Sequence, residues 1–415
     1  MVTLMHSADQ RLPQWQRRIF LLCFGAYGIA YLGRMNLSVA MPFLQAQGFD
    51  KSSLGLVGSC FFWIYAFGQL INGRLGDRFP GRTFVFVGLL GSAVANLLFG
   101  LQSSLVFMLA LWALNGFLQS ILWGPLMRTL ALWHAPLQRA GRALGVFSSA
   151  MLGYAIIWGG LGQLAPRIGW RPLFLIPGGL LFIYAFVWYL GQRTPEEVGV
   201  KAPGGLPSQN EAGSYVALLR STPLARYALV GVFVGFVREG INLWMPTLLR
   251  EVFGISASQT LVLAVIVSSL NLCGLLLARF FVAKIASRGA LTALYTCGTL
   301  IGFLLWATQG GNMVVFGVLL ALCSMFMYGA TSILTSVIPQ ECPMPSTAAG
   351  FIDFVVYLGA GLSGIITGIV SERYQWTAVP ALWVGALLLA GVGILLIHRR
   401  KESLVSMGEG KASVN

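Results

Sequence analysis

Long apolar runs, separated by short polar segments, occupy most of the chain. We count twelve, each close to the length of about 17–25 residues that a helix needs to cross the hydrocarbon core of a bilayer. They lie near residues 19–42, 55–75, 83–101, 105–127, 143–165, 172–191, 224–249, 257–281, 290–308, 312–337, 347–371 and 376–397. Because the runs are continuous and do not alternate with period two, the pattern predicts an all-α membrane protein with twelve transmembrane helices.

A polar segment divides these runs into two sets of six. Residues 192–222 contain three prolines and four glycines, a composition that is typical of a linker. We therefore expect an N-terminal six-helix bundle over residues 1–191, a linker over residues 192–222, and a C-terminal six-helix bundle with a tail over residues 223–415. The local similarity between the halves, described below, predicts that the two bundles are pseudo-symmetric.

The charges are few and unevenly placed. Hydrophobic residues make up 57% of the chain and charged residues 10%, a balance that soluble domains do not have. The net charge of +14 comes mostly from lysines and arginines in the short polar segments, where they set topology, so nucleic acid is not an expected partner. With the N-terminus in the cytoplasm, nineteen of them fall on the cytoplasmic side and five outside. Both termini and the linker are thus expected to be cytoplasmic.

One arginine lies deep inside an apolar run in each half. Arg34 is the sole charge between residues 19 and 42, and both Arg34 and Arg238 stand seven residues before the methionine of a Met-Pro pair. An arginine at such depth costs about 3 kcal/mol by insertion scales, so it faces a polar cavity. Arginine stays protonated and binds carboxylate or phosphate through two parallel hydrogen bonds. The repeat predicts a transporter whose halves each direct one arginine at an anionic solute; the alternative is that each arginine snorkels or pairs structurally.

Further polar and aromatic residues in the runs are candidates for lining a solute path. The 3.6-residue period places two tyrosines and a serine on the face of Arg34, and an asparagine on the face of Arg238. Amide and aromatic side chains on the second, fourth and eleventh runs extend the set, although each aromatic could instead serve packing. The candidates are Tyr27, Tyr31, Ser38, Asn242, Gln69, Gln119, Trp123 and Tyr357.

Two carboxylates also fall within apolar runs. Asp353 lies about 9 Å in from the cytoplasmic end of its helix. Glu239 adjoins Arg238 but is expected to point away from it, because successive residues of a helix do not face each other. Either acid could carry a coupling proton. Alternatively, Asp353 pairs with Arg128 or with a base of residues 73–82, and Glu239 pairs with a neighbouring helix.

The segment between the second and third runs combines an acid with several bases. It reads Gly-Arg-Leu-Gly-Asp-Arg at residues 73–78, followed by Gly-Arg. We predict that Asp77, Arg78 and Arg82, with Arg128, latch helix ends in one conformation. The alternative is that these charges only set the topology.

No catalytic or cofactor-binding pattern is present in the runs. They contain no nucleophile–base pair and no cluster of metal ligands, and the six cysteines form no CxxC pair. No GxxxxGK[ST] phosphate loop occurs. We therefore expect neither an enzyme nor an ATP-driven pump, no metal or cofactor, and a monomeric protein in the bilayer.

Several stretches, spread over most of the chain, match one known family. They are Tyr31-Leu32-Gly33-Arg34 with Met41-Pro42, Asn115-Gly116-Phe117-Leu118-Gln119 with Trp123-Gly124-Pro125, Arg128-Thr129, Gly169-Trp170-Arg171, Thr194-Pro195-Glu196-Glu197-Val198-Gly199, Arg238, and Thr347-Ala348-Ala349-Gly350-Phe351. Together with the six-plus-six architecture, they resemble the major facilitator superfamily and, within it, the organophosphate:phosphate antiporters. The resemblance implies that Arg34 and Arg238 grip a phosphate, and that the protein lies in a plasma membrane, the inner membrane of a bacterium.

Four positions differ from the glycerol-3-phosphate type within that family. Met35 and Leu243 stand where a lysine and an acid are expected, Gln69 where a lysine is expected, and Met151 where a histidine is expected. We expect a secondary active transporter of a small organic anion, a phosphate ester in the first place, that works by alternating access. Two alternatives stay open. One is a proton-coupled symporter of organic carboxylates such as sugar acids, because residues 36–40 resemble a stretch of the related organic anion:cation symporters. The other is a transporter-like membrane sensor.

Overall fold

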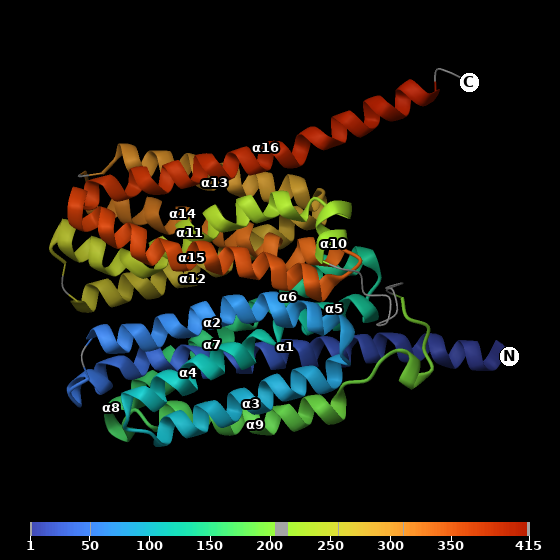
Figure 1. Ribbon diagram of the computed structural model, residues 1–415, viewed down its shortest axis with the longest axis horizontal. Helices are drawn as coiled ribbons and strands as arrows, with labels where there is room; N and C mark the ends of the chain where they lie inside the picture. Colours follow the sequence, from blue (N-terminus) through green and yellow to red (C-terminus); the bar gives the residue numbers. More distant parts are fainter. Residues whose placement is uncertain (1, 50, 204–214, 256, 310, 413–415) are drawn as a thin grey trace. The chain divides into compact units, whose positions relative to one another are not determined.

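The computed structural model describes residues 2–49, 51–203, 215–255, 257–309 and 311–412, and it is almost entirely helical (Figure 1). Eleven helical segments within these residues are long and apolar enough to cross a membrane. The apolar run expected at 257–281 corresponds to α12 (Ala257–Lys284), several of whose side chains are not described. The prediction of an all-α membrane protein with many spans is therefore confirmed.

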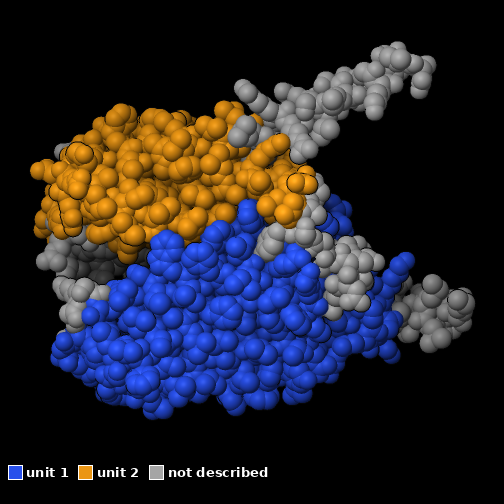
Figure 2. All heavy atoms as spheres, viewed as in Figure 1, with its two compact units in different colours: residues 1–215, 335–354 blue, residues 216–334, 355–415 orange. Residues whose placement is uncertain are grey.

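The chain forms two compact units, coloured separately in Figure 2. Unit 1 comprises residues 1–215 together with residues 335–354, and unit 2 comprises residues 216–334 and 355–415. Residues 204–214 of the expected linker lie outside the described residues. The division of the chain at 192–222 stays a prediction; the short segment 335–354, from the second half of the sequence, clusters with the first half.

Unit 1 contains α1 and the helices that pack with it and with one another. Its elements are α1 (Val2–Ala46), α2 (Lys51–Arg78), α3 (Gly81–Leu101), α4 (Leu105–Ser120), α5 (Trp123–Trp133), α6 (Pro136–Ser148), α7 (Ala150–Tyr154), a π-helical turn (Ala155–Leu161), α8 (Gly162–Ile168) and α9 (Pro172–Gly191). The helix α3 packs against α9, and α2 packs against α4. The break between α4 and α5 precedes Pro125, which has no N–H to continue the helical ladder.

Unit 2 is likewise a bundle of long helices. Its main helices are α11 (Leu224–Phe253), α12, α13 (Ser287–Ala307), α14 (Met313–Ser332), the greater part of α15 (Pro345–Tyr374), and α16 (Val379–Ala412). The helix α14 packs against α12 and α13, and α11 packs against α16. Asn312 caps α14, because its side-chain oxygen accepts bonds from the amides of Val314 at 2.8 Å and Val315 at 3.3 Å.

Candidate functional site

Arg34 lies in a cage of aromatic rings inside unit 1. Its guanidinium carbon is 4.3 Å from the ring centre of Tyr65, 5.1 Å from Phe61, 5.2 Å from Tyr31 and 5.8 Å from Phe62. The residue is only 6% exposed. The rings stabilise a desolvated cation through their negative faces without cancelling its charge. The helices α1 and α2 thus hold a permanent positive charge within a membrane-spanning segment.

Only some of the residues predicted to share the face of Arg34 on α1 lie near the cage. The hydroxyls of Tyr27 and Tyr31 are 3.3 Å apart, and the ring of Tyr27 lies 4.5 Å from that of Trp123. Ser38 is exposed, and its hydroxyl donates to the carbonyl of Met35 at 2.6 Å. The structure therefore brings both tyrosines and the tryptophan together, while the serine bonds to its own helix.

The carbonyl of Gly33, directly before Arg34, is a hydrogen-bond hub that the sequence did not reveal. It accepts from the side-chain nitrogens of Asn115 at 2.9 Å, Gln119 at 3.1 Å and Asn96 at 3.3 Å. All three amides are buried. Three donors on one carbonyl, from α3 and α4, hold the backbone of α1 at the residue that precedes the buried arginine.

The amides of this hub form a wider network. Asn115 accepts from the hydroxyl of Ser92 at 2.6 Å, and Asn96 accepts from the amide of Asn36 at 2.8 Å. The nitrogen of Gln119 also lies 3.1 Å from the carbonyl of Ala30. Gln119, a predicted solute ligand, thus directs its amide nitrogen at the protein. The asparagines inside the apolar runs could have predicted this network, because a buried amide needs hydrogen-bond partners.

The acid Asp353 is linked to the arginine cage through two intervening side chains. The amide nitrogen of Gln69 donates to the Asp353 carboxylate at 3.1 Å and lies 2.6 Å from the hydroxyl of Tyr65. The ring of Tyr65 is the one nearest to Arg34. Asp353 is 5% exposed, and the oxygen of Gln69 is buried without a hydrogen-bond partner among the described residues. Asp353 is therefore connected to the aromatic cage through Gln69 and Tyr65.

Unit 2 corrects one expectation about Arg238. Glu239 does not point away: its carboxylate lies 2.5 Å from the guanidinium of Arg238. Both side chains are long enough to bend towards each other from successive positions, and a cation that is 6% exposed gains from the pairing. The guanidinium carbon is also 5.7 Å from the ring centre of Tyr328.

Two more predicted solute residues also lie in unit 2. Asn242 accepts from Ser324 at 3.3 Å, and the same hydroxyl donates to Asn271 at 3.0 Å. Tyr357 lies on α15, half-buried. The hydroxyl of Ser324 on α14 therefore joins two amide side chains, Asn242 of α11 and Asn271 of α12.

Of the predicted latch residues, Asp77 and Arg128 meet, and the Asp77 carboxylate is the centre of the contacts. Asp77 is fully buried and accepts from Arg128 at 3.1 Å, from the amides of Ser346 at 3.3 Å and Thr347 at 2.7 Å, and from the Thr347 hydroxyl at 2.6 Å. The last three donors belong to the first turn of α15, where a negative charge is favourable. Arg128 pairs here with Asp77, so the expected alternative of an Asp353–Arg128 pair is not what the structure has.

The other two latch candidates lie elsewhere. Arg78 is exposed, and Arg82 donates to the carbonyl of Tyr189 at 2.7 Å on α9. Close backbone packing accompanies the Asp77 contact instead. A side chain at Gly73 would place its Cβ 2.8 Å from the Cα of Gly350, so glycine is required for this approach of α2 and α15.

His134, which follows the last residue of α5, is a buried titratable group that sequence reasoning did not single out. It is fully buried, and its Nδ1–H donates to the carbonyl of Leu130 at 3.1 Å. Its Nε2 has no partner among the described residues, so a second proton there would find no acceptor. Burial, with smaller contributions from Arg142 and Arg139, lowers the pKa of His134 to about 4.

Known proteins with similar sequences are membrane transporters and a related sensor. A glycerol-3-phosphate transporter of Bacillus subtilis (strain 168) is 29% identical over 428 residues, which cover 94% of each chain. The membrane sensor protein UhpC of Salmonella typhimurium is 27% identical over 422 residues, covering 96% of this chain and 94% of that protein. These relatives confirm the resemblance to the organophosphate:phosphate antiporter type that the motifs indicated.

The fold has solved counterparts. The crystal structure of the human organic anion transporter MFSD10 (TETRAN) superposes with a TM-score of 0.74 at 18% sequence identity, over 91% of this chain and 99% of that one. At 18% identity the structural similarity supports the fold and not a shared function. Residues 23–364 match the family model described as Major Facilitator Superfamily. With its membrane-spanning helices, its caged arginine and this match over most of its length, the chain belongs to the Major Facilitator Superfamily.

Proposed function

We propose that this protein carries a small organic anion, in the first place a phosphate ester, across the membrane as a secondary active transporter. The observation that carries the proposal is the caged guanidinium of Arg34, a desolvated permanent cation in a membrane-spanning helix. Arginine binds phosphate oxygens through two parallel bonds, which gives both affinity and orientation. The similarity to a glycerol-3-phosphate transporter favours phosphate over carboxylate.

Arg238 is proposed as the second anion-binding arginine. Its guanidinium lies 2.5 Å from the carboxylate of Glu239, which is 34% exposed. A solute phosphate that approaches Arg238 would compete with this partly exposed carboxylate, so Glu239 acts as an internal substitute for the anion. The pairing also explains how a buried cation is tolerated at this position of α11.

Coupling to protons is proposed to run through Asp353. Its carboxylate bonds to Gln69, and Gln69 in turn bonds to Tyr65, whose ring lies against Arg34. Protonation of Asp353 would remove a negative charge near the cage and so change the attraction between Arg34 and an anion. Asp77 and Arg128 are proposed as the latch that the cycle makes and breaks. The charge count supports cytoplasmic termini. A bacterial inner membrane is proposed from the similarity to a bacterial transporter.

A screen of ligands on the purified protein tests the proposal directly. Phosphate esters and carboxylates are added in a thermal-shift assay, where a true ligand raises the melting temperature by mass action. We expect phosphate esters to give the largest shift. Arg34→Lys and Arg238→Lys should each weaken binding by about 10- to 150-fold, which corresponds to one charge-assisted bond of roughly 1.5–3 kcal/mol. Arg78→Lys, at an exposed arginine, is the matched control.

Two outcomes would contradict the proposal. Unchanged affinity in both lysine variants, at normal expression, would remove the arginines from anion binding. The similarity to the sensor UhpC makes a sensor the second candidate. Uptake of the identified ligand into proteoliposomes distinguishes the two, because a sensor that binds but does not carry the ligand would show no accumulation.

A further inference from the structure

A proline near the end of α14 removes one helical hydrogen bond. In an α-helix the N–H of residue 339 would donate to the carbonyl of Thr335, but residue 339 is a proline and has no N–H. The chain changes here to a π-helical turn (Ile333–Val337) and then to a 3-10 turn (Ile338–Glu341). Thr335 is 2% exposed, so its carbonyl requires a hydrogen-bond donor. We refer to residues 335–341 as the proline break.

Trp123 of α5 provides a donor. Its indole Nε1–H donates to the carbonyl of Thr335 at 3.0 Å, and the tryptophan is 1% exposed. One turn further along α5, the carbonyl of Met127 accepts from the side-chain amide of Gln340 at 3.0 Å. The helix α5 therefore holds the proline break on both sides of Pro339. The polar hydrogen of Trp123, a predicted solute residue, is bound to the protein.

The ring of Trp123 is in contact with α1. It lies 4.5 Å from the ring of Tyr27, whose hydroxyl is 3.3 Å from that of Tyr31. The ring centre of Tyr31 is 5.2 Å from the guanidinium carbon of Arg34. Phe147 of α6 contacts both neighbours, at 5.6 Å from Trp123 and 6.2 Å from Tyr27. A continuous series of contacts thus runs from the buried cation to the proline break.

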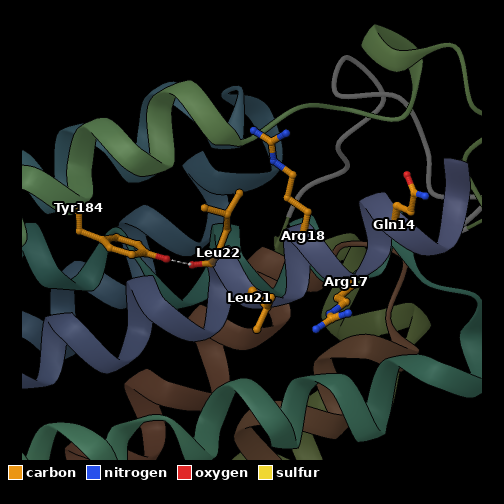
Figure 3. A pocket seen from close by; sticks show the side chains of 6 residues that line it. All are labelled: Gln14, Arg17, Arg18, Leu21, Leu22 and Tyr184. Carbon is orange, nitrogen blue, oxygen red and sulfur yellow. Dashed lines mark hydrogen bonds between the residues drawn. The ribbon is translucent and has the colours of Figure 1, made fainter.

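The backbone of α1 is held in place beside this series. Tyr184 of α9 donates its hydroxyl proton to the carbonyl of Leu22 at 3.0 Å, as Figure 3 shows. A Cβ at position 25 would lie 2.6 Å from the phenol carbon of Tyr184, so this approach needs Gly25. Further along α1, three amides donate to the carbonyl of Gly33. A change beside Arg34 is therefore taken up by side chains and not by a shift of α1.

We propose that Trp123 is a positioning residue that couples the site of Arg34 to the proline break; the coupling rests on the anion site proposed above. Packing alone needs an aromatic ring at this position, but not an N–H directed at the carbonyl whose helical donor a proline has removed. The bond to Thr335 fixes the proline break against α5, and a buried carbonyl that loses a donor is destabilised. Any displacement of the indole therefore changes the stability of the proline break.

A bound anion displaces the indole through the two tyrosines. Hydroxyl groups donate to anions, so the Tyr31 hydroxyl beside Arg34 turns towards the solute and away from Tyr27. The ring of Tyr27 shifts with it, and in a closely packed group of rings Trp123 has to follow. Occupancy of the site thus weakens the bond to Thr335 and releases the proline break.

The reactivity of Cys342 in the detergent-purified protein measures this release. Cys342 directly follows the proline break, is 7% exposed, and has its sulfur 3.6 Å from the carbonyl of Ile338. Trp123→Phe keeps an aromatic ring and removes the N–H. We expect maleimide to label Cys342 about 5- to 150-fold faster in this variant than in the wild type, the factor that follows from one hydrogen bond lost by a buried carbonyl. Unchanged labelling would overturn the proposal.

Two variants separate this bond from a general loss of stability. The indole of Trp133, also on α5 and buried, donates to the carbonyl of Arg193 at 3.0 Å. Trp133→Phe removes that bond with the same change of size and should leave the labelling of Cys342 unchanged. The double variant Trp123→Phe/Pro339→Ala gives residue 339 the N–H that proline lacks and should return labelling to near the wild-type rate. Equal acceleration in Trp133→Phe, or no rescue by Pro339→Ala, would overturn the proposal.

A bound phosphate ester tests the coupling. Glycerol 3-phosphate is added at a concentration that saturates each protein, as judged from the thermal shift. We expect it to accelerate labelling of Cys342 in the wild type and to have no effect in Trp123→Phe, where the bond is already absent. Cys23, which is fully buried on α1, should stay slow throughout and so shows that the variants are folded.

The two proposals fail in different ways. The absence of a thermal shift with any phosphate ester or carboxylate in the wild type would refute the anion site and with it the coupling. A thermal shift without a change in the labelling of Cys342, or an equal response in Trp123→Phe, would refute the coupling alone.

Discussion

Replacing Asp77 by asparagine tests the latch most directly. The change keeps the size of the side chain but removes its charge, and its new amide nitrogen cannot accept a hydrogen bond. The native carboxylate accepts four bonds, one from Arg128 and three from Ser346 and Thr347, at 2.6–3.3 Å. In Asp77→Asn, one amide oxygen is left to accept from four donors.

The expected energy is large because every partner is buried. Arg128 is 6% exposed, and a buried cation that loses its acid costs about 3–5 kcal/mol. Ser346 and Thr347 are also buried, and each bond lost from a charged acceptor adds roughly 1.5–3 kcal/mol. Even the lower bound of about 3 kcal/mol shifts an equilibrium between latched and released states by more than a hundredfold. We expect Asp77→Asn to release the start of α15 from the other helices of unit 1.

Cys342 provides a native reporter of this release. It lies three residues before α15 and is 7% exposed. Burial, with smaller contributions from the charges of Glu341 and Asp77, raises the pKa of its thiol from 9.0 to about 12. Because the thiolate is the reactive form, exposure to water should accelerate labelling by maleimide, by up to roughly a thousandfold. Mass spectrometry of the Cys342 peptide gives the labelling rate.

Loss of the Asp77 charge alone should accelerate labelling only slightly, because that charge is the smallest contribution to the pKa shift of Cys342. Two references complete the test. Cys23 is fully buried on α1, so its labelling must stay slow unless the whole unit unfolds. Arg78→Gln changes the exposed neighbour of Asp77 and should leave the labelling of Cys342 as it is in the wild type. Unchanged labelling of Cys342 in Asp77→Asn, or equal acceleration in Arg78→Gln, would refute the latch.

Three further changes test other parts of the site. Asn115→Leu removes a 2.9 Å bond to the Gly33 carbonyl and should cost roughly 2–3 kcal/mol while weakening anion binding at Arg34; a variant that melts earlier but keeps the full ligand-induced shift contradicts a positioning role. His134 stays neutral when folded because burial lowers its pKa to about 4, so its stabilisation is complete above about pH 6.5 and is lost as pH falls towards 4, on the order of 3 kcal/mol. The melting temperature of His134→Gln should therefore change less between pH 4 and pH 7.5 than that of the wild type. An equal change with pH in both proteins would contradict this. In proteoliposomes we expect uptake of the solute to respond to an imposed proton gradient more than to phosphate inside, and Asp353→Asn to abolish that response; acceleration by internal phosphate alone would support plain exchange.

The sequence by itself determined the class of fold and the position of the central charge. Apolar runs of bilayer length can form only spanning helices, since every backbone polar group in lipid must be satisfied internally. Arg34 could be located for the same reason, because a charge inside such a run is too costly to face lipid. The breaks within the fourth and fifth runs were less visible, because the ends of an element depend on local turns.

Only the tertiary structure decided what surrounds these residues. The hub at Gly33 joins side chains from α3 and α4 to α1, and Asp77 meets Thr347 from 270 positions along the chain. Periodicity records which residues share a face of one helix, but not which face of another helix meets it. The pairing of Arg238 with Glu239 was hidden for a related reason: the positions of Cα atoms on a helix do not show where two long, flexible side chains end. The sequence therefore allowed the buried charged residues to be identified. Their partners could not be predicted, because they depend on the register between helices that packing sets.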